Sequence, residues 1–209
     1  MSGWIDATRP VVSGMPVWPG DAPCRVEWTA RIGAESAANV AELRCSAHTG
    51  THADGPFHVV GGGACIGAAP LDAFIGRALV IPIPPGTALD AAWARGVIAR
   101  DAPERLLIRT GAWTDPSTFP TSFPAPSPEA AQVLADAGLR LLGTDAPSVD
   151  PFDSADLPAH RVLLGAGIAV IENLLLDGVA EGEYDLIALP LRLEEADASP
   201  VRAVLRPAS

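Results

Sequence analysis

Glycine and proline constrain the fold of this chain more than any other feature, because they interrupt regular structure throughout it. The 209 residues include 20 glycines and 21 prolines, spread along the whole sequence. This distribution predicts many short elements joined by tight turns rather than long helices. A chain of this length fits one domain and can bury roughly 70% of its unfolded surface. We therefore expect a single domain over residues 1–209 with a sizeable core.

Short apolar and β-branched runs recur between the turn residues and predict strands. These runs occupy residues 26–31, 40–46, 78–83, 105–110, 139–144, 168–173, 185–191 and 201–206. Several of them contain almost no polar residue, which is typical of strands that are buried on both faces. The pattern favours a sheet with strands in its interior.

Helical signals are fewer. The clearest covers residues 127–137, where Ser127 can cap the helix, Pro128 takes the first helical position and Gly138 can end it. Two shorter helices are predicted at residues 89–100 and 174–180. The mixture of elements predicts an α/β domain with a mixed sheet and a few flanking helices.

The segment from residue 115 to 129 is predicted to be a loop. It contains five prolines and shows no apolar periodicity. Loops of this length often line or cover a functional site, but a connector on the surface would have the same composition. Both interpretations stay open on the sequence alone.

The charged residues exclude several classes of function. The net charge is −11, and all 14 basic residues are arginine. Without lysine the chain has neither a Schiff-base lysine for pyridoxal phosphate nor the lysine of a phosphate-binding P-loop. An acidic chain without basic clusters also has no electrostatic footprint for nucleic acid or an anionic membrane. We therefore expect a small-molecule partner.

Cysteine usage and the N-terminal segment bear on the cellular compartment. The three cysteines, Cys24, Cys45 and Cys65, are odd in number and widely spaced, which fits reduced thiols better than a disulfide framework. The opening "MSGWIDATRP" has no basic region followed by an apolar stretch. These features predict a soluble cytoplasmic protein.

The stretch "HTGTHADGPFH" holds three of the four histidines of the chain within eleven positions. Its three histidines and its aspartate all occupy even positions, so an extended backbone would place them on one side. A straight strand of this length would nevertheless span roughly 33 Å, whereas ligands of one metal ion lie about 2 Å from it. The clustered side chains are His48, His52, Asp54 and His58.

Glycines stand where the backbone would have to bend for these side chains to converge. Gly50 and the Gly55-Pro56 pair interrupt the stretch between its histidines. Glycine tolerates turn conformations and lets the backbone pass close to an ion. A lone histidine would more often be a hydrogen-bonded core residue, but this density and spacing predict a metal site.

Imidazole and carboxylate ligands without a thiolate suit a catalytic zinc, with Mn²⁺ or Fe²⁺ as substitutes. Cys45 lies three residues before His48, so a structural Cys/His zinc site is the competing interpretation. No second cysteine lies nearby, and structural zinc sites usually contain at least two.

His160 and Glu172 are further candidate ligands. His160 precedes the strand-like residues 161–164, and Glu172 interrupts an apolar run where an unpaired carboxylate would be costly to bury. A salt bridge from Glu172 to Arg161 is the alternative. With these two residues the chain offers more ligands than one ion uses, which predicts two metals bridged by carboxylates. His58 is then not needed as a ligand. It could lie next to the ligands without binding a metal, or act as a general acid and base.

Other catalytic schemes find no support. The chain has no G-x-S-x-G nucleophile elbow and no Cys-x-x-Cys motif. The segment "GAGIAV" at residues 165–170 carries two glycines of a dinucleotide fingerprint but lacks the third, and too little chain follows for a Rossmann half.

Several of these motifs resemble those of the metal-dependent cyclase family. The stretch "HTGTHADGPFH" resembles the family signature H-x-G-T-H-x-D-x-P-x-H, and "MPVWPGD" is similar to the segment that precedes it. Three further segments resemble the bacterial kynurenine formamidase branch of this family: "GTDAPSVDP", "LPAHRVLL" and "IENLLLDGV". The likeness extends from about residue 4 to residue 191.

The resemblance implies a specific chemistry, namely hydrolysis of N-formyl-L-kynurenine to L-kynurenine and formate by two zinc ions. It implies one zinc at His48, His52, Asp54 and Glu172, and a second at Asp54, His160 and Glu172. It also implies a compact α/β fold with a mixed, partly barrel-like sheet of the swivelling β/β/α type, and a homodimer.

Two roles outside the ligand set follow from the same resemblance. His58 would act as proton donor and acceptor, and Trp18 would contact the substrate. On local grounds alone, the indole of Trp18 could equally cover the core.

Two alternative functions remain open on the sequence. One is hydrolysis of another amide such as isatin, with manganese in place of zinc. The other is a non-catalytic, metal-stabilised binding protein.

Overall fold

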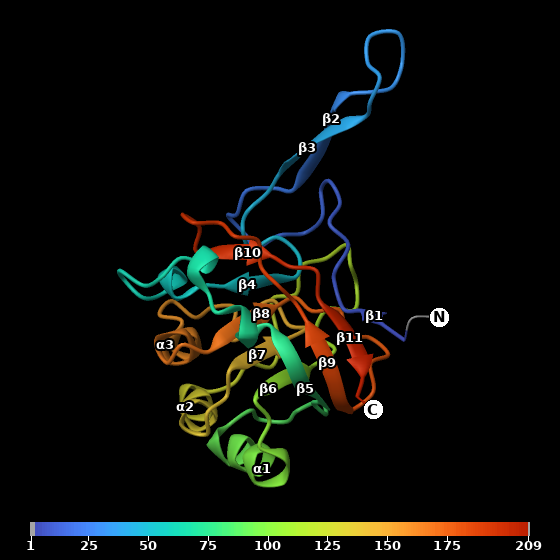
Figure 1. Cartoon of the computed structure of the whole chain (residues 1–209). Helices are drawn as coiled ribbons and strands as arrows, with labels where there is room; N and C mark the ends of the chain where they lie inside the picture. Colours follow the sequence, from blue (N-terminus) through green and yellow to red (C-terminus); the bar gives the residue numbers. More distant parts are fainter. Residues whose placement is uncertain (1–2, 209) are drawn as a thin grey trace.

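A nine-stranded sheet that curls into a half-barrel forms the centre of the molecule in the computed structural model, which describes residues 3–208 (Figure 1). The strand order across the sheet is β1-β11-β9-β5-β6-β7-β8-β4-β10. Its strands are β1 (Ile5–Asp6), β4 (His52–Asp54), β5 (Ile75–Pro82), β6 (Arg105–Arg109), β7 (Leu141–Thr144), β8 (Ala169–Glu172), β9 (Gly182–Ile187), β10 (Ala198–Pro200) and β11 (Val204–Pro207). The predicted α/β class with a mixed, partly barrel-like sheet is confirmed.

The four middle strands are parallel and form the interior of the sheet. Strands β5 to β8 pair in chain order, whereas the pairs on either side of them are antiparallel. Alternate side chains of a strand point to opposite faces. On β6, Leu107 therefore packs into the core inside the curl, while Leu106 and Ile108 pack into a second core under the helices.

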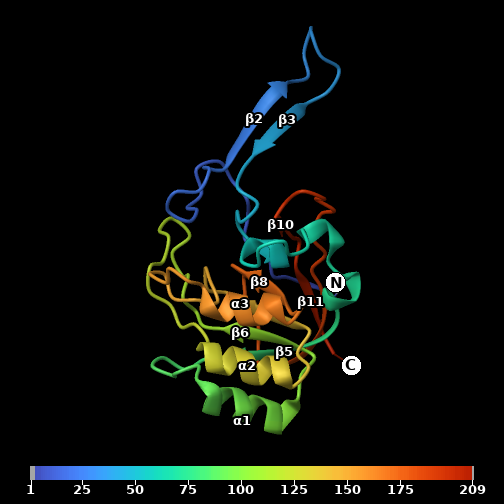
Figure 2. The ribbon, with the colours of Figure 1, turned by 90° about the vertical axis from the view of Figure 1, so that its left-hand side faces the viewer.

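Three helices cover the outer face of the parallel strands: α1 (Ala91–Asp101), α2 (Pro128–Asp136) and α3 (Pro158–Gly165) (Figure 2). They lie side by side, α1 against α2 and α2 against α3, and bury leucines such as Leu134 and Leu163 against the sheet. None of the helices within residues 3–208 has the length and apolarity needed to cross a bilayer.

Most of the predicted elements are confirmed. Each of the eight predicted strands overlaps a strand of the structure, and the helices predicted at 89–100 and 127–137 correspond to α1 and α2. Ser127 caps α2 by accepting a hydrogen bond from the Ala130 N–H through Oγ. Gly138, just after this helix, takes the left-handed conformation with φ of +83°. The loop predicted at 115–129 is irregular as far as the start of α2.

The helix predicted at residues 174–180 is wrong, because this segment forms an irregular turn. Its backbone donors bond to distant parts of the chain: the Leu174 N–H donates to the carbonyl of Thr144, and the Leu175 N–H donates to the carbonyl of Ala7. Leu174 and Leu176 are therefore buried in the core as parts of a connecting segment. Their apolar spacing alone does not distinguish this arrangement from a helix.

The strand-like interpretation of residues 161–164 is also wrong, since they lie in helix α3. Pro158 occupies the first turn, and the Asp150 carboxylate accepts hydrogen bonds from the backbone N–H groups of Ala159 and His160. This carboxylate satisfies donors that a helix start leaves free. Because the cap comes from a residue outside the helix, the local sequence does not reveal it.

Strands β2 (Arg25–Ala30) and β3 (Val40–Arg44) form a separate hairpin that projects away from the body of the molecule (Figures 1 and 2). Every residue of the two strands except Ala30 is exposed. The three short 3-10 turns lie elsewhere, between β4 and β5: η1 (Pro56–His58), η2 (Ile66–Ala68) and η3 (Leu71–Ala73).

Candidate functional site

Strand β4 brings the histidine-rich stretch into the middle of the fold. It lies between β8 and β10, and its register places His52 opposite Glu172 and Asp54 opposite Ala198. Two residues 120 positions apart in the sequence, His52 and Glu172, thus become cross-strand neighbours, whose side chains interact directly. Pairing between strands, rather than local chain geometry, builds the site.

The bends predicted at the glycines are present on both sides of β4. Gly50 has a φ of +65°, a conformation that other residues rarely adopt. At Gly55 the requirement is close approach, because a Cβ atom there would lie 2.8 Å from the backbone nitrogen of Ile66. The stretch therefore turns at Gly50, and again after the extended Gly55, in the 3-10 turn η1 that begins at Pro56.

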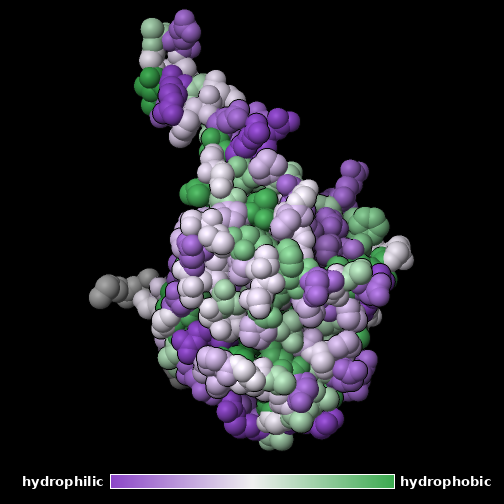
Figure 3. Space-filling view, turned by 180° about the vertical axis from the view of Figure 1, so that it is seen from behind, coloured by the Kyte–Doolittle hydropathy of each residue, from purple (hydrophilic) through white to green (hydrophobic). Residues whose placement is uncertain are grey.

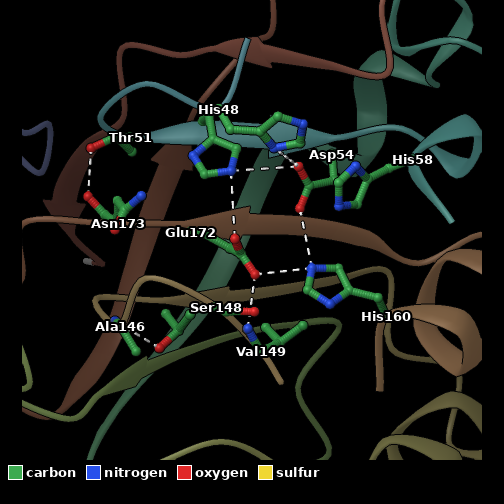
Figure 4. A network of polar contacts seen from close by, with 12 residues as sticks. His48, Thr51, Asp54, His58, Ala146, Ser148, Val149, His160, Glu172 and Asn173 are labelled. Atoms are coloured by element: carbon green, nitrogen blue, oxygen red, sulfur yellow. Dashed lines mark hydrogen bonds and ion pairs between the residues drawn. The ribbon is translucent and has the colours of Figure 1, made fainter. Parts of the chain in front are cut away.

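Helix α3 supplies the residue that closes the site from the other side. Its His160 ring is buried, with Nε2 lying 3.0 Å from Glu172 Oε1 and 3.5 Å from Asp54 Oδ2 (Figure 4). The opposite nitrogen, Nδ1, donates to the Asp150 carboxylate over 2.7 Å. Asp150 thus holds both the backbone and the ring of His160 in place.

The remaining side chains converge on Asp54 from the strand side. Asp54 Oδ1 lies 3.1 Å from His48 Nδ1 and 3.5 Å from His52 Nε2, and His52 Nε2 lies 3.5 Å from Glu172 Oε2. Two groups have ligand atoms within 4.8 Å of one another, and both contain Asp54: His48 with His52 and Asp54, and Asp54 with His160 and Glu172. The arrangement can hold two adjacent cations that share a carboxylate.

Unpaired buried atoms test whether this cluster suits a metal. Among residues 3–208, His52 Nε2 and both carboxylate oxygens of Asp54 are buried without a hydrogen-bond partner. Leaving such groups unpaired in the interior costs free energy, especially for a charged carboxylate. These atoms point at one another across the cluster, so divalent cations bound between them would satisfy all three. The donor set, imidazole plus carboxylate, also suits zinc.

The charge states of the cluster are consistent with cation binding. Burial raises the pKa of Asp54 and of Glu172, but the neighbouring histidines outweigh it and hold both pKa values below their usual range. Burial lowers the pKa of His48, yet the hydrogen bond to Asp197 and the adjacent carboxylate of Asp54 outweigh it and raise this pKa to about 10. Both carboxylates are therefore ionised at neutral pH, as metal ligands must be.

His58 lies beside the cluster rather than within it. Its ring centre is 4.5 Å from that of His48 and 5.6 Å from that of His160, and it is half-buried at the end of η1. The ring hydrogen-bonds through Nδ1 to Asp197, a residue that the sequence did not single out. His58 is thus near the cluster, but it belongs to neither of the two groups of ligand atoms that contain Asp54.

An aromatic wall faces the cluster across a cavity of about 250 Å³. Trp18 stands in this wall, with its ring centre 5.1 Å from that of Phe152 and 5.5 Å from that of Phe119. Trp113 packs against Phe119 at 5.2 Å. Trp18 and Phe119 line the cavity, so Trp18 belongs to the site rather than to either hydrophobic core. The loop predicted at 115–129 lines the site through Phe119.

The structure does not support two alternatives raised by the sequence, the salt bridge between Glu172 and Arg161 and the Cys/His zinc site. Arg161 does not pair with Glu172, because its guanidinium donates to the backbone carbonyls of Asp156 and Val59. Glu172 instead accepts the backbone N–H of Val149 within the cluster. Within the part of the chain that the structure describes, no candidate metal group contains a cysteine, so the Cys/His zinc site finds no support.

Two side chains of the site, Asp150 and Asp197, were missed by the sequence analysis. Asp150 lies in the quoted segment "GTDAPSVDP", yet nothing local shows that it caps the helix that begins at Pro158. Asp197 lies in an acidic stretch near the C-terminus that looks like solvated surface. Only the pairing of the following strand, β10, with β4 brings Asp197 to the histidines.

Comparison with known proteins gives a consistent result. Residues 5–151 match the family described as "Putative cyclase". The chain is 46% identical over 206 residues to the kynurenine formamidase of Paracidovorax citrulli, covering 96% of this chain and 95% of that protein. It is 45% identical over 206 residues to the kynurenine formamidase of Salinibacter ruber, covering 98% and 97%.

Solved structures share the fold over nearly the whole chain. Isatin hydrolase A from Labrenzia aggregata, bound to benzyl benzoate, superposes with a TM-score of 0.84 at 26% identity, covering 99% of this chain and 94% of that one. A structure described as a potential metal-dependent hydrolase with cyclase activity superposes with a TM-score of 0.83 at 28% identity, covering 99% and 98%.

Proposed function

Because this chain belongs to the cyclase family and is a metal-dependent amide hydrolase, we propose that it hydrolyses N-formyl-L-kynurenine to L-kynurenine and formate in tryptophan degradation. Support comes from the kynurenine formamidases that are 43% to 46% identical to it over nearly their full length. The observation that carries the proposal is the cavity in which aromatic side chains face the carboxylate–imidazole cluster. A formanilide matches both parts of this cavity, because its arene can lie against the aromatic side chains while its amide faces the cluster.

The proposal assigns the cluster to two zinc ions. His48, His52, Asp54 and Glu172 would hold one, and Asp54, His160 and Glu172 the other; the two overlapping groups of ligand atoms support this division. When bound, zinc would supply Lewis acidity, which polarises a carbonyl oxygen and lowers the pKa of water. Mn²⁺ is a substitute, because the carboxylates of the cluster suit it.

The remaining steps fall to side chains of the chain itself. His58 stands at the edge of the cavity, where it can pass a proton to the aniline nitrogen as the amide bond breaks. Trp18 and Phe119 offer faces on which the arene can stack, which holds the formyl group toward the cluster. The aromatic wall thereby favours aryl amides over aliphatic ones.

A direct assay tests the proposal. The purified protein should release formate from N-formyl-L-kynurenine and contain about two zinc ions per chain by metal analysis on the same sample. Removal of the metal with a chelator should abolish formate release, and added zinc should restore it. Absence of formate release from the zinc-loaded protein would contradict the proposal.

Hydrolysis of isatin is the second candidate, favoured by the similarity to the solved isatin hydrolase. Isatin is likewise an aryl amide, although its amide lies in a ring. The same aromatic wall and metal cluster could therefore receive it. Parallel assays with the two substrates distinguish the candidates through the ratio of their kcat/KM values. A higher kcat/KM for isatin would replace the first assignment.

We further propose that the protein forms a homodimer through the projecting hairpin. On one face, Val26 lies opposite Leu43 and Trp28 opposite Ala41, and the large side chains among them are exposed. Figure 3 shows apolar and polar side chains together on the surface of this arm. An isolated two-stranded hairpin is only marginally stable in water, so its apolar face requires a cover.

The charges of the hairpin indicate a second copy as the cover. On the other face, Arg25 lies opposite Arg44 and Glu27 opposite Glu42, and such like-charged pairs destabilise a hairpin. A copy related by a two-fold axis can bring the arginine pair of one hairpin to the glutamate pair of the other. Residues 25–44 carry three arginines and three glutamates, so this arm is neutral in a chain of net charge −11.

Light scattering coupled to gel filtration tests the dimer. The unaltered protein should have the mass of two chains, and Trp28→Ser should shift it toward one. Leu71→Ser is the matched control, because Leu71 is 62% exposed but lies on η3 away from the hairpin. A dimer that survives the Trp28 substitution, or an unaltered protein with the mass of one chain, would contradict the interface.

The proposal places the protein in the cytoplasm. All three cysteines are free thiols in the structure, and Cys24 is buried. Free thiols are typical of a reducing compartment.

A further inference from the structure

One carboxylate oxygen of Asp197 forms hydrogen bonds with two histidines of the site. Oδ2 lies 3.0 Å from His48 Nε2 and 3.0 Å from His58 Nδ1. A carboxylate oxygen only accepts, so both rings must donate to it. Asp197 does not line the cavity, whereas both histidines do.

We propose that Asp197 is the positioning residue of the site, whose carboxylate sets the proton position and the orientation of His48 and His58 at once. This inference rests on the proposed function for its catalytic consequence only. The geometric part, a proton on His48 Nε2 and another on His58 Nδ1, stands independently of the substrate.

The two hydrogen bonds have opposite consequences for the two rings. His48 donates through Nε2, so its Nδ1, which lies 3.1 Å from Asp54 Oδ1, is the nitrogen that can lose its proton and bind a metal. His58 donates through Nδ1, so its Nε2 is the nitrogen left to exchange a proton with a substrate. A single carboxylate thereby selects a ligand tautomer in one histidine and an acid–base tautomer in the other.

The backbone around Asp197 is rigid enough for this task. The residue immediately precedes β10, in which Ala198 pairs with Asp54 of β4. Its own carbonyl accepts the N–H of Gly55 over 2.7 Å, and the carbonyl of Ala196 accepts the N–H of Ile66. Asp197 is therefore fixed to the backbone of the strand that carries the candidate ligands. A side chain held in this way can orient others.

A third metal site is the competing explanation, because His48, His58 and Asp197 offer ligand atoms within 4.8 Å of one another. Two observations favour positioning. The contacts to Asp197 have ordinary hydrogen-bond lengths, and its side chain is 38% exposed, against 1% for Asp54. The two explanations differ in metal content.

Nitrogen-15 NMR of the zinc-loaded protein tests the geometric part without any substrate. The chain has only four histidines, so their ring nitrogens can be assigned individually. We expect a proton on His58 Nδ1 and on His48 Nε2 in the unaltered protein. A ring of His58 with an unprotonated Nδ1 would overturn the proposal, even if the enzyme hydrolyses the expected substrate.

Asp197→Asn tests the catalytic part, since it keeps the size of the side chain but removes the charge. At saturating zinc it should retain the metal content of the unaltered protein, lower kcat by about 10- to 100-fold and leave KM nearly unchanged. Glu195→Gln, an exposed charge removal two residues earlier, is the matched control and should change neither. Loss of one zinc in Asp197→Asn would show a ligand instead and overturn positioning.

A double-mutant cycle separates positioning from general loss of structure. If Asp197 acts through His58, then Asp197→Asn should lower kcat by less than about 3-fold in a His58→Ala background. If Asp197 has only a structural role, Asp197→Asn should lower kcat by the same factor in both backgrounds. That result would overturn the proposal. If the protein proves inactive on every amide, the NMR result still decides the placement of the protons.

Discussion

Asp54 is the residue on which the candidate metal centre most depends, because it belongs to both groups of ligand atoms. Its carboxylate is 1% exposed and has no hydrogen-bond partner among residues 3–208. A buried anion of this kind requires nearby positive charge. The surrounding imidazoles supply part of it, and two cations would supply the rest.

Glu172→Gln should weaken metal binding as well as catalysis. The glutamate lies 3.0 Å from His160 Nε2 and 3.5 Å from His52 Nε2, between the two groups of ligands. The neutral amide of glutamine is a poorer metal ligand than a carboxylate, and it has no negative charge that two cations could share. We expect fewer than two zinc equivalents and at least about 100-fold lower kcat/KM. Two full equivalents in the variant would refute the bridging role.

His58→Ala should separate chemistry from metal binding. Since His58 belongs to neither group of ligand atoms that contains Asp54, the variant should keep its zinc while losing about 100- to 10,000-fold in kcat, as removal of a general acid–base group does. Zinc analysis and formate release on one sample check this prediction. Turnover near that of the unaltered enzyme would remove His58 from the proton transfer.

Zinc should bind more tightly as the pH rises. The pKa of His48 is raised to about 10 in the metal-free protein, chiefly by Asp197 and Asp54 acting against burial. His48 is thus protonated at neutral pH, and a raised pKa means that this proton must leave before the nitrogen can bind a metal. Competition with a chelator at pH 6.5 and pH 8.5 should give a lower Kd at the higher pH. An unchanged Kd would contradict it.

At the scale of elements, the site depends on how β4 fits between its neighbours. The strand has only three residues, yet it contributes two candidate ligands and pairs on both edges. Gly50 and Gly55 flank it, one with a left-handed conformation and the other against the backbone of Ile66. Small changes at these turns should therefore move the ligands.

Gly55→Ala should destabilise the fold. The new Cβ would lie 2.8 Å from the Ile66 nitrogen and 3.0 Å from its Cα, and neither backbone atom can move aside freely. We expect a loss of about 1–3 kcal/mol in the free energy of unfolding, as overpacking costs. Gly61→Ala is the control, because nothing lies within 4 Å of its Cβ position. Urea denaturation of both variants measures the difference, and equal midpoints would contradict the prediction.

The aromatic wall shows how loops complete a site that strands begin. Trp18 comes from the segment before β2, Phe119 from the proline-rich loop and Phe152 from the loop before α3. The sequence predicted the loop at 115–129 but left open whether it lines a site. Aromatic packing between segments distant in the chain decides the question, and no local pattern encodes that packing.

At the scale of the whole molecule, the candidate metal centre joins parts of the chain that are far apart in the sequence. The candidate ligands come from the turn before β4, from β4 itself, from α3 and from β8. A cation bound among them stabilises only the folded state, because the unfolded chain separates them by more than a hundred residues.

Removal of the metal should therefore lower the melting temperature. At zinc concentrations 100-fold above Kd the stabilisation is about 2.7 kcal/mol per site, which corresponds to a shift of roughly 5–10 °C for a domain of this size. Calorimetry with and without a chelator measures it. The shift should shrink in Glu172→Gln, and an equal shift in that variant would indicate that the chelator acts elsewhere.

The sequence by itself determined the chemistry of the site and most of the elements. The residue types and spacing of His48, His52 and Asp54 predicted a metal site, and apolar periodicity predicted the strands, because both signals are local. The strand-like residues 161–164 and the helix at 174–180 were wrong because distant groups, not local pattern, take up their backbone donors.

Only the tertiary structure decided which residues meet. The register of β4 against β8 placed His52 opposite Glu172, and the pairing of β10 with β4 brought Asp197 to two histidines. Strand register follows from the burial of whole faces across the sheet, which no short window of sequence contains. The candidate ligands could therefore be named from the chain, but the carboxylates that hydrogen-bond to them, Asp150 and Asp197, could not.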